Sequence, residues 1–182
     1  MIALLVVDVQ KEYSGSGALP VEKFDQSLAN IRRLLEAARS SDVATVVHIR
    51  HISRVPGDQS FDAGSPGIDF VDSARPEPGE LVLTKHYIGS FSNPDLDRFL
   101  RGQSVDRIVI CGYTSFICCD TTAREAVQLG YKVHFVEDAI SEFSLGEISA
   151  AELHRIVTAV QGAVFSTVTS TDDAVALLAG KT

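Results

Sequence analysis

The sequence is poor in cysteine and in basic residues, and each shortage narrows the class of protein. It has three cysteines, Cys111, Cys118 and Cys119. This odd number disfavours the disulfide framework of a small secreted protein and favours a reducing cytoplasm. The 16 Lys and Arg residues are outnumbered by 24 Asp and Glu, for a net charge of −8 at pH 7. Because the basic residues are also scattered, we expect no nucleic-acid partner.

A long apolar run is missing at the N-terminus. The stretch MIALLVVDVQKEY has no basic segment and reaches Asp8 after Met1 and only six further apolar residues. It predicts a buried strand and neither a signal peptide nor a membrane span, so we expect a cytoplasmic protein without a membrane partner. With 45% hydrophobic and 22% charged residues, the chain fits one globular domain over residues 1–182.

Short β-branched runs alternate with longer stretches of helical period along the chain. Predicted strands include ALLVVDV, VATVVHI, ELVLTK, DRIVICG and KVHFVEDA. The alternation predicts a single three-layer α/β/α domain with a central, mostly parallel, Rossmann-like sheet. Gly130 and Gly162 follow helical stretches, where a left-handed C-terminal residue is favoured. The long irregular segment 52–79 is interpreted as a lid or an interface element.

Ligands of open parallel sheets bind outside the carboxyl ends of the strands, where the strand order reverses. Asp8 ends the first predicted strand, Lys85 ends the third, and Cys118 follows the fourth at the start of the helix TTAREAVQL. The helix dipole there favours an anion and lowers a thiol pKa. Taken alone, Asp8 also fits an ordinary strand-end carboxylate, and Lys85 a surface residue.

Cys118 and Cys119 compete for the role of a reactive thiol, because adjacent helical residues point about 100° apart. If Ala123 and Ala126 face the sheet, Cys119 shares their face and Cys118 turns toward the loops. Cys111, inside RIVICG, fits a small buried hydrophobe. Ring strain and the absence of a CxxC spacing disfavour a vicinal redox pair. We therefore favour Cys118.

The segments LLVVDVQKEY, LTKHYIGSF and ICGYTSFICCDTTAREAVQLGYKVHFVEDA resemble, in this order, the isochorismatase-like cysteine hydrolase superfamily, which includes nicotinamidases and N-carbamoylsarcosine amidohydrolases. The resemblance spans residues 2 to about 170 and implies the isochorismatase-like hydrolase fold. By position it implies a catalytic triad of Asp8, Lys85 and Cys118. It also implies a non-proline cis peptide just before Thr114, which turns the N–H groups of Thr114 and Cys118 toward an oxyanion.

The residue types implied by the resemblance predict a hydrolase that cleaves the C–N bond of a small amide, ureido or carbamoyl compound. Asp8 would act as general base, Lys85 would offset the charges, and Cys118 would form a thioester that water hydrolyses. One alternative is vinyl-ether hydrolysis of an isochorismate-like substrate, which can dispense with the thiol. Another is a catalytically silent interaction module. The resemblance further implies a homo-oligomer, either a dimer or a tetramer.

Zinc-binding members of the superfamily place a D-W-H triplet after the second strand, with another His some residues later. The matching positions here are His51, Ile52 and Ser53, and no His lies between residues 52 and 85. His48 and His51 are also poorly placed to share a metal on an extended segment. We therefore expect no metal, no other cofactor, and a substrate other than nicotinamide.

Several residues near the predicted rim could line a substrate pocket, although a core position is the alternative for each aromatic one. The predicted pocket residues are Tyr13, Arg50, His51, Tyr87, Phe91, Tyr113 and Phe116.

Overall fold

The computed structural model describes residues 1–181, in which six strands form one parallel sheet in the order β3-β2-β1-β4-β5-β6. The predicted domain end at residue 182 lies outside the described residues. The strands are β1 Ile2–Val7, β2 Ala44–His51, β3 Leu81–Lys85, β4 Arg107–Tyr113, β5 Lys132–Ser141 and β6 Thr167–Thr169. Every neighbouring pair runs parallel. The predicted α/β fold with a parallel sheet is confirmed.

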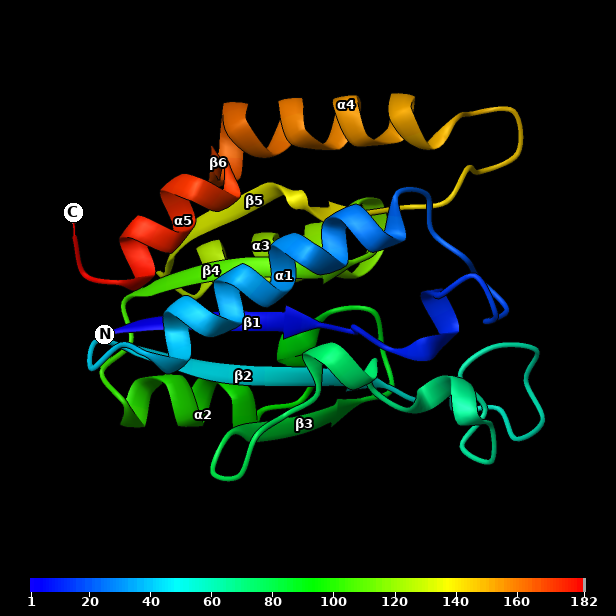
Figure 1. Cartoon of the computed structure of the whole chain (residues 1–182), viewed down its shortest axis with the longest axis horizontal. Coiled ribbons are helices and arrows are strands. Elements are labelled where there is room, and N and C mark those ends of the chain that lie inside the picture. The colour runs from blue at the N-terminus through cyan, green and yellow to red at the C-terminus, as the bar shows by residue number, and fades with distance from the viewer. Residues whose placement is uncertain (182) are drawn as a thin grey trace.

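Helices cover both faces of this sheet, which gives the three predicted layers (Figure 1). One face packs against α1 (Phe24–Arg39) and α5 (Thr171–Leu178), and the other against α2 (Asp95–Gly102) and α3 (Asp120–Gln128). A further helix, α4 (Ala150–Val160), lies beyond β5 near the edge of the sheet. The apolar residues of β1 alternate between the two layers, which explains why a strand without polar residues is stable here.

The direction in which successive strands are added reverses between β1 and β4. Strands β1 to β3 extend to one edge and β4 to β6 to the other, so the adjacent ends of β1 and β4 form the switch point of the sheet. Gly112 lies at a bulge in β4 with a φ of 123°, and a Cβ there would sit 2.0 Å from the carbonyl oxygen of Val7. Only glycine permits this close approach of β4 to β1.

The segment 52–79 packs beside the chain that follows β1. It contains short 3-10 helices at Pro66–Ile68 and Asp72–Ala74, and Gln10 forms an isolated antiparallel bridge with Phe70. Its role as a lid or an interface element stays a prediction.

The two glycines predicted to end helices behave differently. Gly130 has a left-handed φ of 91°, as predicted. The prediction for Gly162 was wrong, because this residue lies inside a π-helical turn, Gln161–Phe165, that continues from α4. The buried amide of Gln161 donates to Asp120 at 2.7 Å and accepts from Ser166 at 2.7 Å, which holds the turn in place.

None of the helices in residues 1–181 combines the length and apolarity that a bilayer crossing requires.

Candidate active site

Three side chains that carry reactive groups meet at the carboxyl end of the sheet. Asp8 follows β1, Lys85 ends β3, and Cys118 lies in the π-helical turn Ser115–Cys119 that leads from β4 to α3. The Nζ atom of Lys85 lies 2.8 Å from Oδ2 of Asp8 and 3.4 Å from Sγ of Cys118. We call these three residues the candidate triad. Parallel strands bring them together because their carboxyl ends meet at one edge.

The backbone turns sharply at Asp8, which has a left-handed φ of 52°. Aspartate tolerates this conformation better than most residues. Its N–H donates to the carbonyl of Ile49 at 3.0 Å, and its own carbonyl accepts from Gln10 at 2.7 Å. Its side chain is wholly buried, and Oδ1 has no hydrogen-bond partner in residues 1–181. A buried acceptor without a partner is uncommon, and it keeps Asp8 a candidate for the predicted role of general base.

The structure separates the roles of the three cysteines. Cys119 is wholly buried and packs with Ala123 and Ala126 against the sheet, as predicted. Cys111 is a buried core residue of β4. Cys118 keeps 4% of its surface exposed and contacts Lys85. All three thiols are free of disulfides, and only the position of Cys118 fits a nucleophile.

The electrostatic state of the thiol differs from the sequence expectation. The pKa of Cys118 is raised to about 12, chiefly by burial and then by the charge of Asp8, while Lys85 opposes both. The effect of burial on the thiol pKa therefore outweighs the lowering expected from the helix dipole, and the resting thiol is protonated at neutral pH. Burial also lowers the pKa of Lys85, but the charges of Asp8 and Cys118 outweigh it and raise that pKa, so Lys85 stays an ammonium ion.

The segment between β4 and α3 carries further polar groups. The peptide bond between Tyr113 and Thr114 is cis, as the resemblance implied. The carbonyl of Thr114 accepts from the N–H of Cys119 at 3.0 Å. The hydroxyls of Thr114 and Ser115 are buried and have no partner within the part of the chain that the structure describes. Unpartnered polar groups therefore gather beside Cys118, where the N–H groups of Thr114 and Cys118 are predicted to form an oxyanion hole.

The loop that follows Lys85 is anchored to α3. Ser90 Oγ lies 2.8 Å from Thr122 Oγ1, and the N–H of Phe91 donates to Glu125 at 3.2 Å. Lys85 Nζ itself donates to the carbonyl of Tyr87 at 3.2 Å. The helix that follows Cys118 thus also fixes the segment that places the ammonium group of Lys85.

Two predicted pocket residues lie next to the candidate triad. The Nδ1 atom of His51 is 3.4 Å from Lys85 Nζ. Tyr13 is buried, and its pKa is raised well above the usual value by burial and then by the charges of Cys118 and Asp8. Both side chains therefore belong to the immediate surroundings of the reactive groups.

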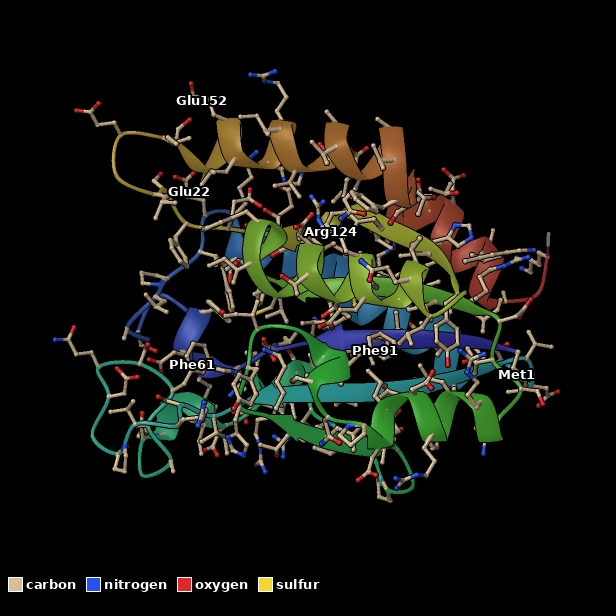
Figure 2. The ribbon with its side chains drawn as sticks, turned by 180° about the vertical axis from the view of Figure 1, so that it is seen from behind. Met1, Glu22, Phe61, Phe91, Arg124 and Glu152 are labelled. Carbon is tan, nitrogen blue, oxygen red and sulfur yellow. The ribbon has the colours of Figure 1, made fainter. Side chains whose placement is uncertain are left out.

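The side chains of the other predicted pocket residues make contacts outside the candidate triad, although the main-chain carbonyl of Tyr87 accepts from Lys85. The roles of these residues as substrate ligands stay predictions. Arg50 reaches Thr84, the exposed ring of Tyr87 lies beneath Arg54, Phe91 stacks on Tyr131, the buried Tyr113 lies beside Ser27, and Phe116 contacts Phe143. Figure 2 places Phe91 between Met1 at one end of the molecule and Phe61 toward the other.

Sequence reasoning missed Phe61, in the segment 52–79. It is 5% exposed, and its ring packs edge-on against Tyr13 at 5.3 Å and His51 at 5.0 Å between centroids. Figure 2 shows it opposite Met1, the residue that precedes β1, and therefore at the carboxyl end of the sheet. The available signal was an aromatic residue in a segment rich in Gly, Pro, Ser and Asp, a signal that it shares with Phe70.

Residues 1–181 contain no cluster of three or more His, Cys, Asp or Glu side chains that could hold a metal ion. The absence of a metal requirement stays a prediction. A cavity of about 330 Å³ lies between the start of α1, the end of β5 and the start of α4, and the candidate triad does not line it.

Comparisons with known proteins agree with this architecture. The isochorismatase domain model matches residues 2–173. The chain is 34% identical over 170 residues to the secreted isochorismatase effector Isc1 of Verticillium dahliae, covering 93% of this chain and 88% of that protein. It is 27% identical to the ureidoacrylate amidohydrolase RutB of Variovorax paradoxus, covering 94% and 79%. A cysteine hydrolase structure from Pseudomonas syringae superposes with a TM-score of 0.92 at 30% identity, covering 100% and 93%.

Proposed function

We propose that this chain, which belongs to the isochorismatase family, is a cysteine hydrolase that cleaves the C–N bond of a small amide, ureido or carbamoyl compound without a metal ion. The observation that carries the proposal is the position of Lys85 Nζ, 2.8 Å from Asp8 and 3.4 Å from Cys118. The similarity to an amidohydrolase and to a cysteine hydrolase structure supports it.

The first half of the reaction forms a thioester. Cys118 Sγ attacks the carbonyl carbon while Asp8 accepts the thiol proton, because the raised thiol pKa leaves little free thiolate. The carbonyl oxygen becomes an oxyanion that accepts hydrogen bonds from the N–H groups of Thr114 and Cys118. The oxyanion then collapses, the C–N bond breaks, and the leaving nitrogen takes the proton from Asp8.

The second half regenerates the thiol. Asp8 takes a proton from a water molecule, whose oxygen attacks the thioester carbon. The C–S bond breaks, the acid product leaves, and the proton returns from Asp8 to Cys118. Lys85 stays charged throughout and offsets the negative charge as it moves between carboxylate and sulfur.

Vinyl-ether hydrolysis is the second candidate, favoured by the name of the Verticillium relative. It relies on acid chemistry by Asp8 and does not need the thiol. A catalytically silent interaction module would need neither Asp8 nor Cys118.

Release of ammonia or amine from a panel of amides, ureido acids and carbamoyl compounds tests the proposal. We expect Cys118→Ala to lose about a thousandfold or more in kcat, while the matched Cys119→Ala variant stays active. Retained activity of Cys118→Ala on an isochorismate-like compound would instead support the vinyl-ether reaction.

Alkylation provides a test that needs no substrate. Iodoacetamide is expected to label Cys118 in preference to Cys111 and Cys119, and the labelling should slow in Asp8→Asn. Equal, slow labelling of all three cysteines, with no turnover of any compound, would support the silent module.

A further inference from the structure

The ammonium group of Lys85 has more acceptors within reach than it has protons. Its Nζ lies 2.8 Å from Asp8 Oδ2, 3.2 Å from the carbonyl of Tyr87, and 3.4 Å from both Cys118 Sγ and His51 Nδ1. An ammonium ion has three N–H donors, and Lys85 is only 1% exposed. Four protein acceptors therefore compete for its three N–H groups, and removal of one acceptor lets the ammonium group move toward the others.

The ring of His51 is held in place from two sides. Gln10 clamps the main chain of His51, donating to its carbonyl at 2.9 Å and accepting from its N–H at 2.7 Å. The ring of Phe61 packs edge-on against the imidazole at 5.0 Å. A side chain fixed in this way keeps Nδ1 directed at Lys85.

The contact defines the protonation of His51. An ammonium ion can only donate, so Nδ1 must accept, and the ring proton lies on Nε2. The titratable groups that surround the ring are Lys85 on β3, Asp8 after β1, and His86 and Asp58 on the adjoining loops. Burial and then Lys85 lower the pKa of His51, which keeps the imidazole neutral at pH 7.

We propose, resting on the cysteine hydrolase function above, that His51 is a positioning residue that holds the Lys85 ammonium group within reach of Cys118 by accepting one of its protons at Nδ1. Without this acceptor the ammonium group relaxes toward Asp8 and loses its contact with sulfur. Protonation of His51 has the same effect, because the imidazolium repels Lys85.

Two variants separate this role from simple packing. His51→Asn keeps an acceptor near the position of Nδ1 and does not titrate, whereas His51→Leu keeps volume and removes the acceptor. The readout is the rate of Cys118 alkylation by iodoacetamide from pH 5.5 to 8.5, with the labelled peptide mapped and the urea midpoint measured for each variant.

At pH 7.5 we expect His51→Leu to react about tenfold more slowly than the wild type, as loss of a charge-assisted hydrogen bond predicts. His51→Asn should recover most of the rate. The ratio of the His51→Asn rate to the wild-type rate should be constant above pH 7 and rise as the pH falls toward 5.5, because only the wild type loses its acceptor when His51, whose pKa lies below its usual value, becomes protonated.

A wild-type rate and pH dependence in His51→Leu would overturn the proposal, as would an equal loss in both variants. If His51→Leu does not fold, a constant Asn-to-wild-type ratio across the whole pH range overturns it by itself. These outcomes differ from failure of the proposed function, in which the wild type labels selectively at Cys118 but hydrolyses no amide. Equal labelling of all three wild-type cysteines would overturn both.

Discussion

Replacement of Lys85 by methionine tests how much the buried Asp8–Lys85 ion pair contributes to stability once the cost of desolvating both charges is included. Asp8 is wholly buried and Lys85 is 1% exposed, so neither charge is solvated. At 2.8 Å and an effective dielectric constant of about 20, their attraction is about 6 kcal/mol. Desolvation of the two ions costs a similar amount, so the intact pair adds little net stability.

Removal of one partner of the ion pair lowers the free energy of unfolding by much more than the intact pair contributes. Lys85→Met leaves the Asp8 carboxylate buried, and its Oδ1 atom already has no hydrogen-bond partner in the described residues. We expect a loss of about 3–5 kcal/mol in the free energy of unfolding at pH 7. The double variant Asp8→Asn/Lys85→Met removes both charges and should recover most of that loss.

The pH dependence has a defined sign. A buried carboxyl group without a partner has a raised pKa in the folded state, so it is tolerated below its unfolded pKa of about 3.9 and destabilises as pH rises. The deficit of Lys85→Met should therefore be small near pH 4 and grow toward pH 8.

Urea denaturation between pH 4 and 8 measures both effects, with the exposed Lys132→Met variant as a control expected within about 0.5 kcal/mol of the wild type. A loss below about 1 kcal/mol that is independent of pH would refute the reasoning. So would a double variant that is no more stable than Lys85→Met.

Two further predictions concern the framework of the site. Gly112→Ala should lower the free energy of unfolding, measured by urea denaturation, by about 2 kcal/mol or more, because a Cβ would lie 2.0 Å from the carbonyl oxygen of Val7 at a φ of 123°. Gly15→Ala is the control, since Gly15 has open space around it. Equal losses in the two variants would contradict the argument. His48 is wholly buried, with Nε2 3.0 Å from Glu80, and burial lowers its pKa although Glu80 opposes this. Its neutral form contributes stability above pH 6.5 that is lost on acidification, so His48→Gln should flatten the decline in unfolding free energy from pH 7 to 5, and an unchanged slope would count against this.

The reactive residues could be located from the sequence because their positions follow from topology. In a parallel sheet, residues that end different strands share one edge, so Asp8 and Lys85 could be placed together without any knowledge of loops. The face of Cys118 followed from helical geometry, since Cys119 shares a side with Ala123 and Ala126.

What the sequence could not predict depends on burial and on contacts between distant segments. The position of Cys118 near a helix start favours a low thiol pKa, but its burial reverses this and raises the pKa. The contact of His51 with Lys85 depends on the register of β2 against β3, and the packing of Phe61 against His51 depends on how the segment 52–79 folds back over β2. Such loop conformations have no periodic pattern along the chain.

The charges of the candidate site suggest why it can remain almost closed to water. At rest it holds a carboxylate, an ammonium ion, a neutral thiol and a neutral imidazole, so its net charge is zero. Transfer of the proton from Cys118 to Asp8 relocates the negative charge to sulfur, still beside Lys85 at 3.4 Å, without creating a new charge. Because isolated charges are expensive in a buried environment, this transfer is feasible there only while His51 stays neutral. Protonation of His51 would place a second cation beside Lys85, repel the ammonium group from Cys118 and leave a thiolate there without its counter-charge.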